Sequence, residues 1–218
     1  IYCECGWTDS VDKGKLPTRA EVKKYLEQRL EELQRKGDSL DVITYAGNGE
    51  PTLHPDFSEI IDDSIELRNK YFPWAKIAVL SNSTMLNKPK VIAALKKVDQ
   101  NILKLDSAFD STIKLLNQPR VKFSAEELVN NLKSFEGNLI IQTLFLRGSY
   151  DEKTIDNTTD SEVAAWLDLV KAIRPKEVMI YTIARDTPAK GLEKVSLKDL
   201  KVIASKVEAI GIPIQVSA

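Results

Sequence analysis

The sequence of 218 residues predicts one α/β domain, built as an open sheet or a barrel-like arc of parallel strands. Short β-rich runs alternate with longer helical patterns at a spacing of roughly 30 residues, which is typical of parallel strands with helical crossovers. The strands are nearly continuous apolar runs, as expected when both faces of a sheet are buried. No run rich in Gly, Pro or Ser divides the chain, so we predict a single domain over residues 1–218.

The helices are indicated by residues at their ends and by apolar residues that recur on one face. Pro17 and Thr18 open the first helix, and Gly37 follows its end. Ser161 is a candidate N-cap of a later helix, and Gly211 follows the last one. We predict helices over residues 16–36, 57–71, 88–98, 110–117, 124–135, 160–173 and 196–210.

The strands are the short apolar runs between these helices, and the most apolar of them lies at residues 139–145. The runs predict strands over residues 41–46, 76–80, 102–106, 139–145, 178–183 and 212–216. Because this order begins with a helix, we expect a first strand to lie before residue 1.

Composition gives no sign of a nucleic-acid or membrane partner. The 31 basic and 32 acidic residues leave no excess of positive charge to attract phosphate or an anionic bilayer. No apolar run approaches the ~20 residues of a membrane span. Cys3 and Cys5 are too few for a disulfide scaffold, which favours a reducing compartment, the cytoplasm. Their spacing fits neither the C-x-x-C redox pattern nor a zinc half-site, so taken alone they are two thiols near a terminus.

Polar residues lie on or just after every predicted strand but the last. In folds of this kind the carboxyl ends of the strands meet at one edge, where ligands bind. We therefore expect a shared site at that edge. The residues are Gly47, Asn48, Gly49, Glu50, Pro51, Ser81, Asn82, Lys104, Asp106, Gln142 and Tyr181.

These residues also have structural explanations. Glycines after a strand often only make a turn. Lys104 and Asp106, two residues apart and so on one face, are alternatively an ion pair inside the protein. Gln142 alternatively bonds a side chain of a neighbouring strand. His54, the only histidine, stands beside Pro55 and is typical of a loop or surface position.

The run AGNGEPTLHP at residues 46–55 resembles the glycine-glycine-glutamate motif of radical S-adenosylmethionine (SAM) enzymes. Its G-x-G-E-P-T-L form is that of the Fe–S oxidoreductase branch, which includes wyosine-synthase-like and activating-enzyme-like proteins. Further pieces follow in the family's order. LSNS at 80–83 is similar to its Thr-Asn-Gly, LKLDS at 103–107 to its Ser-Leu-Asp-Ala, and LLNQP at 115–119 to its Ile-Asn-x-Pro. The resemblance covers nearly the whole chain and implies a partial (β/α)6 TIM-like barrel of parallel strands.

The first residues, Ile1-Tyr2-Cys3, are similar to the end of the family's cluster motif C-x-x-x-C-x-aromatic-C. The resemblance implies that Cys3 is one of three thiolate ligands of a [4Fe–4S] cluster. It implies a cysteine directly before Ile1 and another four positions earlier. Cys5 lies outside the motif. With Cys3 alone, we expect the chain to hold no stable cluster and to be inactive.

The resemblance also implies a SAM pocket. Asn48, Gly49 and Glu50 are expected to meet the methionine amino group, with Gly47 and Pro51 in the same loop. Asn48 stands where the family has the first glycine of its pair.

The other implied cofactor contacts come from five places. Ser81 and Asn82 line the pocket, Asp106 accepts from the ribose hydroxyls, Tyr2 packs beside the adenine, and Gln142 and Tyr181 face the cofactor. Lys104 stands where the family has Ser, and it reaches either the SAM carboxylate or an anionic substrate. No residue is identified as the catalyst of the substrate step.

The function that follows from the resemblance is reductive cleavage of SAM to a 5′-deoxyadenosyl radical, which abstracts hydrogen from an unknown substrate. A flavodoxin or ferredoxin is the expected electron donor. A small molecule, a tRNA base and a glycine of a partner protein remain open as substrates. Balanced charge is against large phosphate contacts, and the Lys104–Asp106 pair slightly favours a glycyl-radical activating enzyme. The alternative class is an α/β module that binds SAM or another small molecule without radical chemistry.

Overall fold

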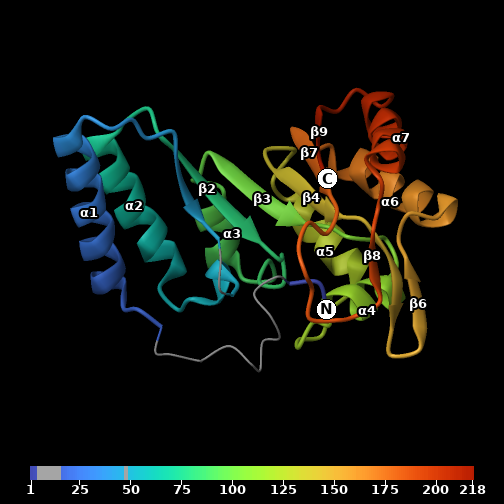
Figure 1. Cartoon of the computed structure of the whole chain (residues 1–218). Coiled ribbons are helices and arrows are strands. Elements are labelled where there is room, and N and C mark those ends of the chain that lie inside the picture. Colours follow the sequence, from blue (N-terminus) through green and yellow to red (C-terminus); the bar gives the residue numbers. More distant parts are fainter. Residues whose placement is uncertain (4–15, 47–48) are drawn as a thin grey trace. The chain divides into compact units, whose positions relative to one another are not determined.

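The computed structural model of the chain describes residues 1–3, 16–46 and 49–218, and it has the predicted α/β fold (Figure 1). Six strands form a parallel sheet in the order β1-β2-β3-β4-β7-β9. They are β1 (Val42–Tyr45), β2 (Lys76–Ser81), β3 (Gln100–Lys104), β4 (Ile140–Leu144), β7 (Glu177–Tyr181) and β9 (Ile214–Ser217).

The described residues group into two compact units, and the boundary falls within β3. The β1–β2 unit contains residues 16–46, 49–81 and 88–102, and the β4–β9 unit contains residues 1–3, 82–87 and 103–218. The single domain over residues 1–218 stays a prediction.

The β1–β2 unit contains α1 (Arg19–Lys36), η1 (Pro51–Leu53), α2 (Phe57–Tyr71) and α3 (Pro89–Leu95). Thr18 is the N-cap of α1 and forms a capping box with Glu21, and Gly37 ends the helix in the left-handed region. The helices α1 and α2 lie side by side, in blue and teal (Figure 1), around the buried Leu30 and Leu67.

A buried carboxylate also joins α1 to α2. Asp63 accepts two hydrogen bonds from Arg19, at 2.6 Å from Nε and 2.9 Å from Nη2, and a third from Lys23 Nζ at 3.1 Å. The Asp63 side chain is 7% exposed. Its hydrogen bonds with the Arg19 guanidinium lower the pKa of Asp63, and those with Lys23 add to this against the opposite effect of burial.

The β4–β9 unit contains α4 (Asp110–Asn117), α5 (Ala125–Lys133), α6 (Asp160–Ile173) and α7 (Leu197–Glu208). One face of its strands is buried against α6. There Trp166 donates from Nε1 to Thr143 Oγ1 at 3.1 Å and packs edge-on against Phe145. Because side chains alternate along a strand, Gln142 and Tyr181 lie on the opposite face, which is only partly buried.

A second, antiparallel sheet of order β6-β5-β8 is present, which the sequence did not predict. It consists of β5 (Leu146–Tyr150), β6 (Lys153–Asp156) and β8 (Leu192–Lys194). Asp151 and Glu152 join β5 to β6 with φ of 51° and 59°, as in a type I′ turn. At Gly148, φ is 125°, and an added Cβ would lie 2.0 Å from the carbonyl oxygen of Gly191.

Two local predictions were wrong. The N-cap of α6 is Thr159 rather than Ser161, because the Thr159 hydroxyl accepts from the Glu162 amide at the first turn. The third strand ends at Lys104, so Asp106 follows it rather than belonging to it. No helix in the described part of the chain has the length and apolarity needed to cross a membrane.

Candidate functional site

In the β1–β2 unit, the Glu50 carboxylate is held in one orientation at the carboxyl end of β1. Its Oε1 atom accepts from the Thr52 amide at 3.1 Å, from the Thr52 hydroxyl, and from Ser81 Oγ at 2.8 Å. Thr52 and Ser81 are 2% and 6% exposed. Glu50 thereby caps η1 and links the ends of β1 and β2. A carboxylate fixed in this way is suited to accept hydrogen bonds from an ammonium group.

Of the residues around Glu50, Gly47 and Asn48 lie outside the described residues. Gly49 has a φ of 134°, a conformation that favours glycine, while the space beside it is open. Pro51 is the first residue of η1. The predicted contacts of this loop with the methionine amino group stay a prediction.

Asn82, described within the β4–β9 unit, makes a turn with its own chain. Its Oδ1 accepts from the Thr84 amide at 3.0 Å and from the Thr84 hydroxyl at 2.6 Å. The next residue, Ser83, has a φ of 67°. The predicted place of Asn82 in a SAM pocket stays untested.

The β4–β9 unit brings Lys104, Asp106, Tyr181 and Tyr2 together. Lys104 Nζ donates to the Tyr181 hydroxyl at 2.7 Å and lies 3.3 Å from Asp106 Oδ1. It also lies 4.8 Å from the centroid of the Tyr2 ring. The side chains of Lys104 and Asp106 are 8% and 0% exposed. The ion-pair alternative for these two residues is therefore confirmed.

The charges in this cluster are stabilised by each other. Burial alone would lower the pKa of Lys104, but the Asp106 carboxylate and the hydroxyls of Tyr181 and Tyr2 raise it well above its usual value. Burial raises the pKa of Tyr2, against the opposite effect of the neighbouring ammonium. Lys104 is therefore a cation and Tyr2 a neutral phenol.

Asp106 is held in place by the Leu144 backbone and the Asn157 side chain. Its Oδ1 accepts from the Leu144 amide at 2.8 Å, and its carbonyl oxygen accepts from Asn157 Nδ2 at 3.0 Å. Asn157 also joins β4 to β5, because it donates to Leu144 O and accepts from the Leu146 amide. Asp106 Oδ2 is buried without a hydrogen-bond partner among the described residues. That oxygen is the acceptor left for the ribose contact that the resemblance implies.

Cys3 is exposed and lies two positions after Ile1, which is anchored by its backbone. The Ile1 nitrogen donates to Leu116 O at 3.3 Å, and the Ala189 amide donates to Ile1 O at 3.3 Å. An accessible thiol on a held segment fits a ligand of an iron–sulfur cluster. Within the ranges the structure describes, no three His, Cys, Asp or Glu side chains gather to hold a metal ion.

Further residues share a sheet face with Gln142 and Tyr181 and were not predicted from the sequence. The strand register puts Gln142, Met179 and Gln215 in one row, and Tyr181 is paired with Ser217 in the next row toward the carboxyl ends. Alternation along the last strand was the available signal, but the predicted strand stopped at residue 216 and was taken to carry no polar group.

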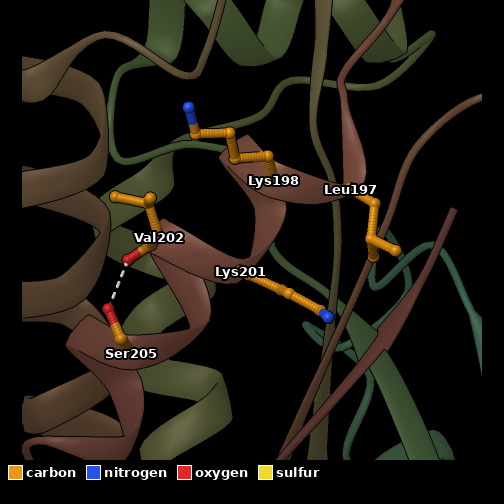
Figure 2. Close-up of a pocket in the computed structure, with 5 residues that line it drawn as sticks. All are labelled: Leu197, Lys198, Lys201, Val202 and Ser205. Carbon is orange, nitrogen blue, oxygen red and sulfur yellow. Dashed lines mark hydrogen bonds between the residues drawn. The ribbon is translucent and has the colours of Figure 1, made fainter.

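A surface pocket lies on α7, and none of its lining residues is a predicted site residue. Figure 2 shows its lining, and Lys198 and Lys201 point in different directions rather than toward a common point. Ser205 Oγ donates to Val202 O at 2.8 Å within the helix. This arrangement does not converge on a ligand.

An α/β fold with an oriented carboxylate at a strand end and an exposed thiol on an anchored segment is the framework of a cofactor-binding protein. The chain belongs to the radical SAM superfamily, whose family model matches residues 1–160. The cofactors of this superfamily are SAM and an iron–sulfur cluster.

Curated relatives are longer than this chain. It is 28% identical over 201 residues to a UPF0026 protein of Synechocystis sp., covering 81% of this chain and 71% of that protein. It is 26% identical to a protein named GTPase Obg from Brachyspira hyodysenteriae and to a UPF0026 protein of Helicobacter pylori. The matches cover 86% and 87% of this chain, but only 26% and 58% of the lengths of those proteins.

Solved structures share the fold at low sequence identity. A radical SAM methyltransferase from Sphaerobacter thermophilus matches with a TM-score of 0.66 at 15% identity, over 92% of this chain and 57% of that one. A domain of pyruvate-formate lyase-activating enzyme from Bacteroides vulgatus matches with a TM-score of 0.60 at 13% identity, over 82% of this chain and 99% of that one. These likenesses confirm the predicted fold class.

Proposed function

We propose that this chain is the core of a radical SAM oxidoreductase of the cytoplasm. The observation that carries the proposal is the Glu50 carboxylate, fixed by Thr52 and Ser81 within the motif that resembles the family's glycine-glycine-glutamate sequence. When bound, a reduced [4Fe–4S] cluster and SAM would together supply a 5′-deoxyadenosyl radical that abstracts hydrogen from the substrate.

In this proposal the residues of the chain bind and orient the two cofactors. Glu50 accepts from the methionine amino group, where a charge-assisted hydrogen bond is strong. Cys3 ligates one iron through its thiolate. Asp106 Oδ2 is an acceptor for a ribose hydroxyl, and the half-buried Gln142 and Tyr181 face the cofactor. An electron donor such as flavodoxin or ferredoxin reduces the cluster.

The substrate is a small molecule, a tRNA base or a glycine of a partner protein. The last choice would make the protein a glycyl-radical activating enzyme. It is favoured by the fold match to nearly the whole of a pyruvate-formate lyase-activating enzyme domain, and by the Lys104–Asp106 pair. Against the tRNA base stands the balanced charge of the chain, with 31 basic and 32 acidic residues.

The test is SAM cleavage by the full-length protein after anaerobic reconstitution with iron and sulfide. With dithionite as reductant, we expect 5′-deoxyadenosine to form, measured by liquid chromatography. Glu50→Gln should slow its formation by roughly tenfold or more, because the amide loses the charge of the acceptor. Glu126→Gln on the exposed face of α5 is the matched control and should match the wild type.

The alternative function is a binding module without radical chemistry. A wild-type protein that carries its full iron content and binds SAM, but forms no 5′-deoxyadenosine, would establish that alternative and exclude the oxidoreductase. If 5′-deoxyadenosine forms, its yield on adding candidate proteins, tRNA or small molecules identifies the substrate class.

A further inference from the structure

Lys104 is a buried cation whose contacts come from its own chain. Of the three hydrogens of its ammonium, one is donated to Tyr181 and one faces Asp106 Oδ1. The Tyr2 ring, with its centroid 4.8 Å from Nζ, lies beside the same ammonium. With 8% of its side chain exposed, Lys104 is enclosed by groups of its own chain. Its placement points to a role within the protein.

Tyr2 stands between an anchored residue and an exposed thiol. The backbone nitrogen of Ile1 donates to Leu116 O, and its backbone oxygen accepts from the Ala189 amide. The residue is 9% exposed and belongs to an apolar cluster. Tyr2 packs against the same cluster. Cys3, one residue further, is exposed. Tyr2 directly precedes the thiol, and the contact of its side chain with Lys104 holds that part of the chain in place.

We propose that Lys104 is a positioning residue that clamps Tyr2 and thereby fixes the Cys3 segment for cluster binding. An ammonium beside an aromatic ring in a desolvated place is a substantial attraction, larger than at the surface. Asp106 and Tyr181 hold the ammonium where it meets the ring. The inference rests on the proposed function only in taking an iron–sulfur cluster as what Cys3 binds.

The test uses the metal-free full-length protein and follows hydrogen exchange of single amides. The Ala189 amide reports on the segment, because it donates to Ile1 O. The variant is Lys104→Met combined with Asp106→Asn, so that no buried carboxylate is left without its cation. We expect the Ala189 amide to exchange about tenfold faster. The amides of Leu105 and Phe145, which donate to Gln142 O and Tyr181 O, should keep their rates.

Two further variants separate a clamp from a general loss of stability. Tyr2→Leu leaves the buried ion pair in place and should speed exchange at Ala189 to the same degree. Adding it to the Lys104→Met and Asp106→Asn changes should give no further increase, because both remove one contact. Lys70→Met is the matched control. Lys70 Nζ lies 4.6 Å from the Tyr71 ring centroid on α2, in the other unit, and its loss should leave Ala189 unchanged.

The second readout is iron retention. After reconstitution with ferrous iron and sulfide, the variant with Lys104→Met and Asp106→Asn should bind iron about tenfold more weakly than the wild type. Competition with a chelator measures this difference. Unchanged exchange at Ala189 in Tyr2→Leu overturns the proposal, and so does additivity of the two sets of changes. If the clamp behaves as described but the wild type takes up no iron, the proposed function fails and the clamp stands.

Discussion

At the scale of single residues, Glu50 shows how a short motif fixes the orientation of a carboxylate. Its carboxylate receives three hydrogen bonds on one oxygen, two of them from Thr52, which stands two positions later. Because the side chain is already oriented, the binding of a cationic ligand causes a smaller loss of side-chain entropy. Under the proposed function, the hydroxyls of Thr52 and Ser81 therefore assist binding by orienting the carboxylate that accepts from the ligand.

Ser81→Ala should weaken SAM binding to the cluster-loaded full-length protein by roughly tenfold. A hydrogen bond to a charged acceptor contributes about 1.5–3 kcal/mol. Part of this energy keeps Glu50 oriented for SAM, and a loss of about 1.4 kcal/mol in binding corresponds to a tenfold change in the dissociation constant. Isothermal titration calorimetry measures the change. Ser205→Ala is the control, because that hydroxyl bonds only within the exposed face of α7. An unchanged dissociation constant for Ser81→Ala would remove Ser81 from the site.

At the scale of elements, α1 is held on α2 by the Asp63 carboxylate as well as by apolar packing. Asp63→Asn should reduce the free energy of unfolding by about 1–3 kcal/mol at pH 7, measured by urea denaturation. Asp62→Asn is the control, since its ion pair with Lys97 is about half exposed and such pairs contribute little.

The loss should depend on pH. The pKa of Asp63 is lowered in the folded protein by the hydrogen bonds from Arg19, so its stabilising effect is present above the unfolded value of about 3.9. That effect disappears as pH falls through the lower folded pKa. The gap between wild type and Asp63→Asn should therefore close as the pH falls below the unfolded pKa and through the lower folded pKa. A gap that widens as the solution is acidified would contradict this role.

The parallel sheet and its helices could be predicted because their signals are local. The ends of α2 and α4 agree with the predicted ranges 57–71 and 110–117. The antiparallel sheet could not be predicted, because β5 follows β4 after a single residue, Phe145, and no turn signal in the sequence separates the two strands. The two-residue turn has Asp151 and Glu152 where Asn-Gly would have indicated a hairpin.

The same turn yields a test of that explanation. Glu152→Gly should stabilise the protein, because glycine adopts a φ of 59° without the cost that a side chain imposes there. We expect an increase in Tm of about 2–4 °C by differential scanning calorimetry. Glu126→Gly, in the first turn of α5, should instead lower the Tm. A lower Tm for Glu152→Gly would mean that this side chain makes a stabilising contact.

At the scale of the whole molecule, the site was predicted as a set of strand ends rather than as contacts. The sequence identified Lys104, Asp106 and Tyr181 as polar residues at strand ends, and the structure shows that they meet. It could not show that Asn157 bonds the backbone of Asp106, because 51 residues separate them. The contact between Lys104 and Tyr2 could not be predicted either, because it depends on the tertiary fold that brings two distant parts of the chain together.

The cysteine content gives a prediction for the whole chain. These 218 residues contain two cysteines, of which Cys3 alone matches the cluster motif. Reconstituted by itself, the 218-residue polypeptide should retain almost no iron and form no 5′-deoxyadenosine, while under the proposed function the full-length protein should do both. Iron and sulfide assays on the two proteins side by side provide the measurement. A stable cluster on the 218-residue polypeptide would contradict this prediction.

The meeting of Gly148 with Gly191 carries a consequence for evolution and for engineering. No side chain fits at position 148, since even a methyl group would overlap a carbonyl oxygen of the adjacent strand. In a saturation library selected for folding, this position should return only glycine, whereas exposed neighbours such as Ser149 should vary freely. The spacing between the two backbones therefore excludes substitutions at position 148. New side-chain contacts in this part of the protein can be introduced only at neighbouring positions.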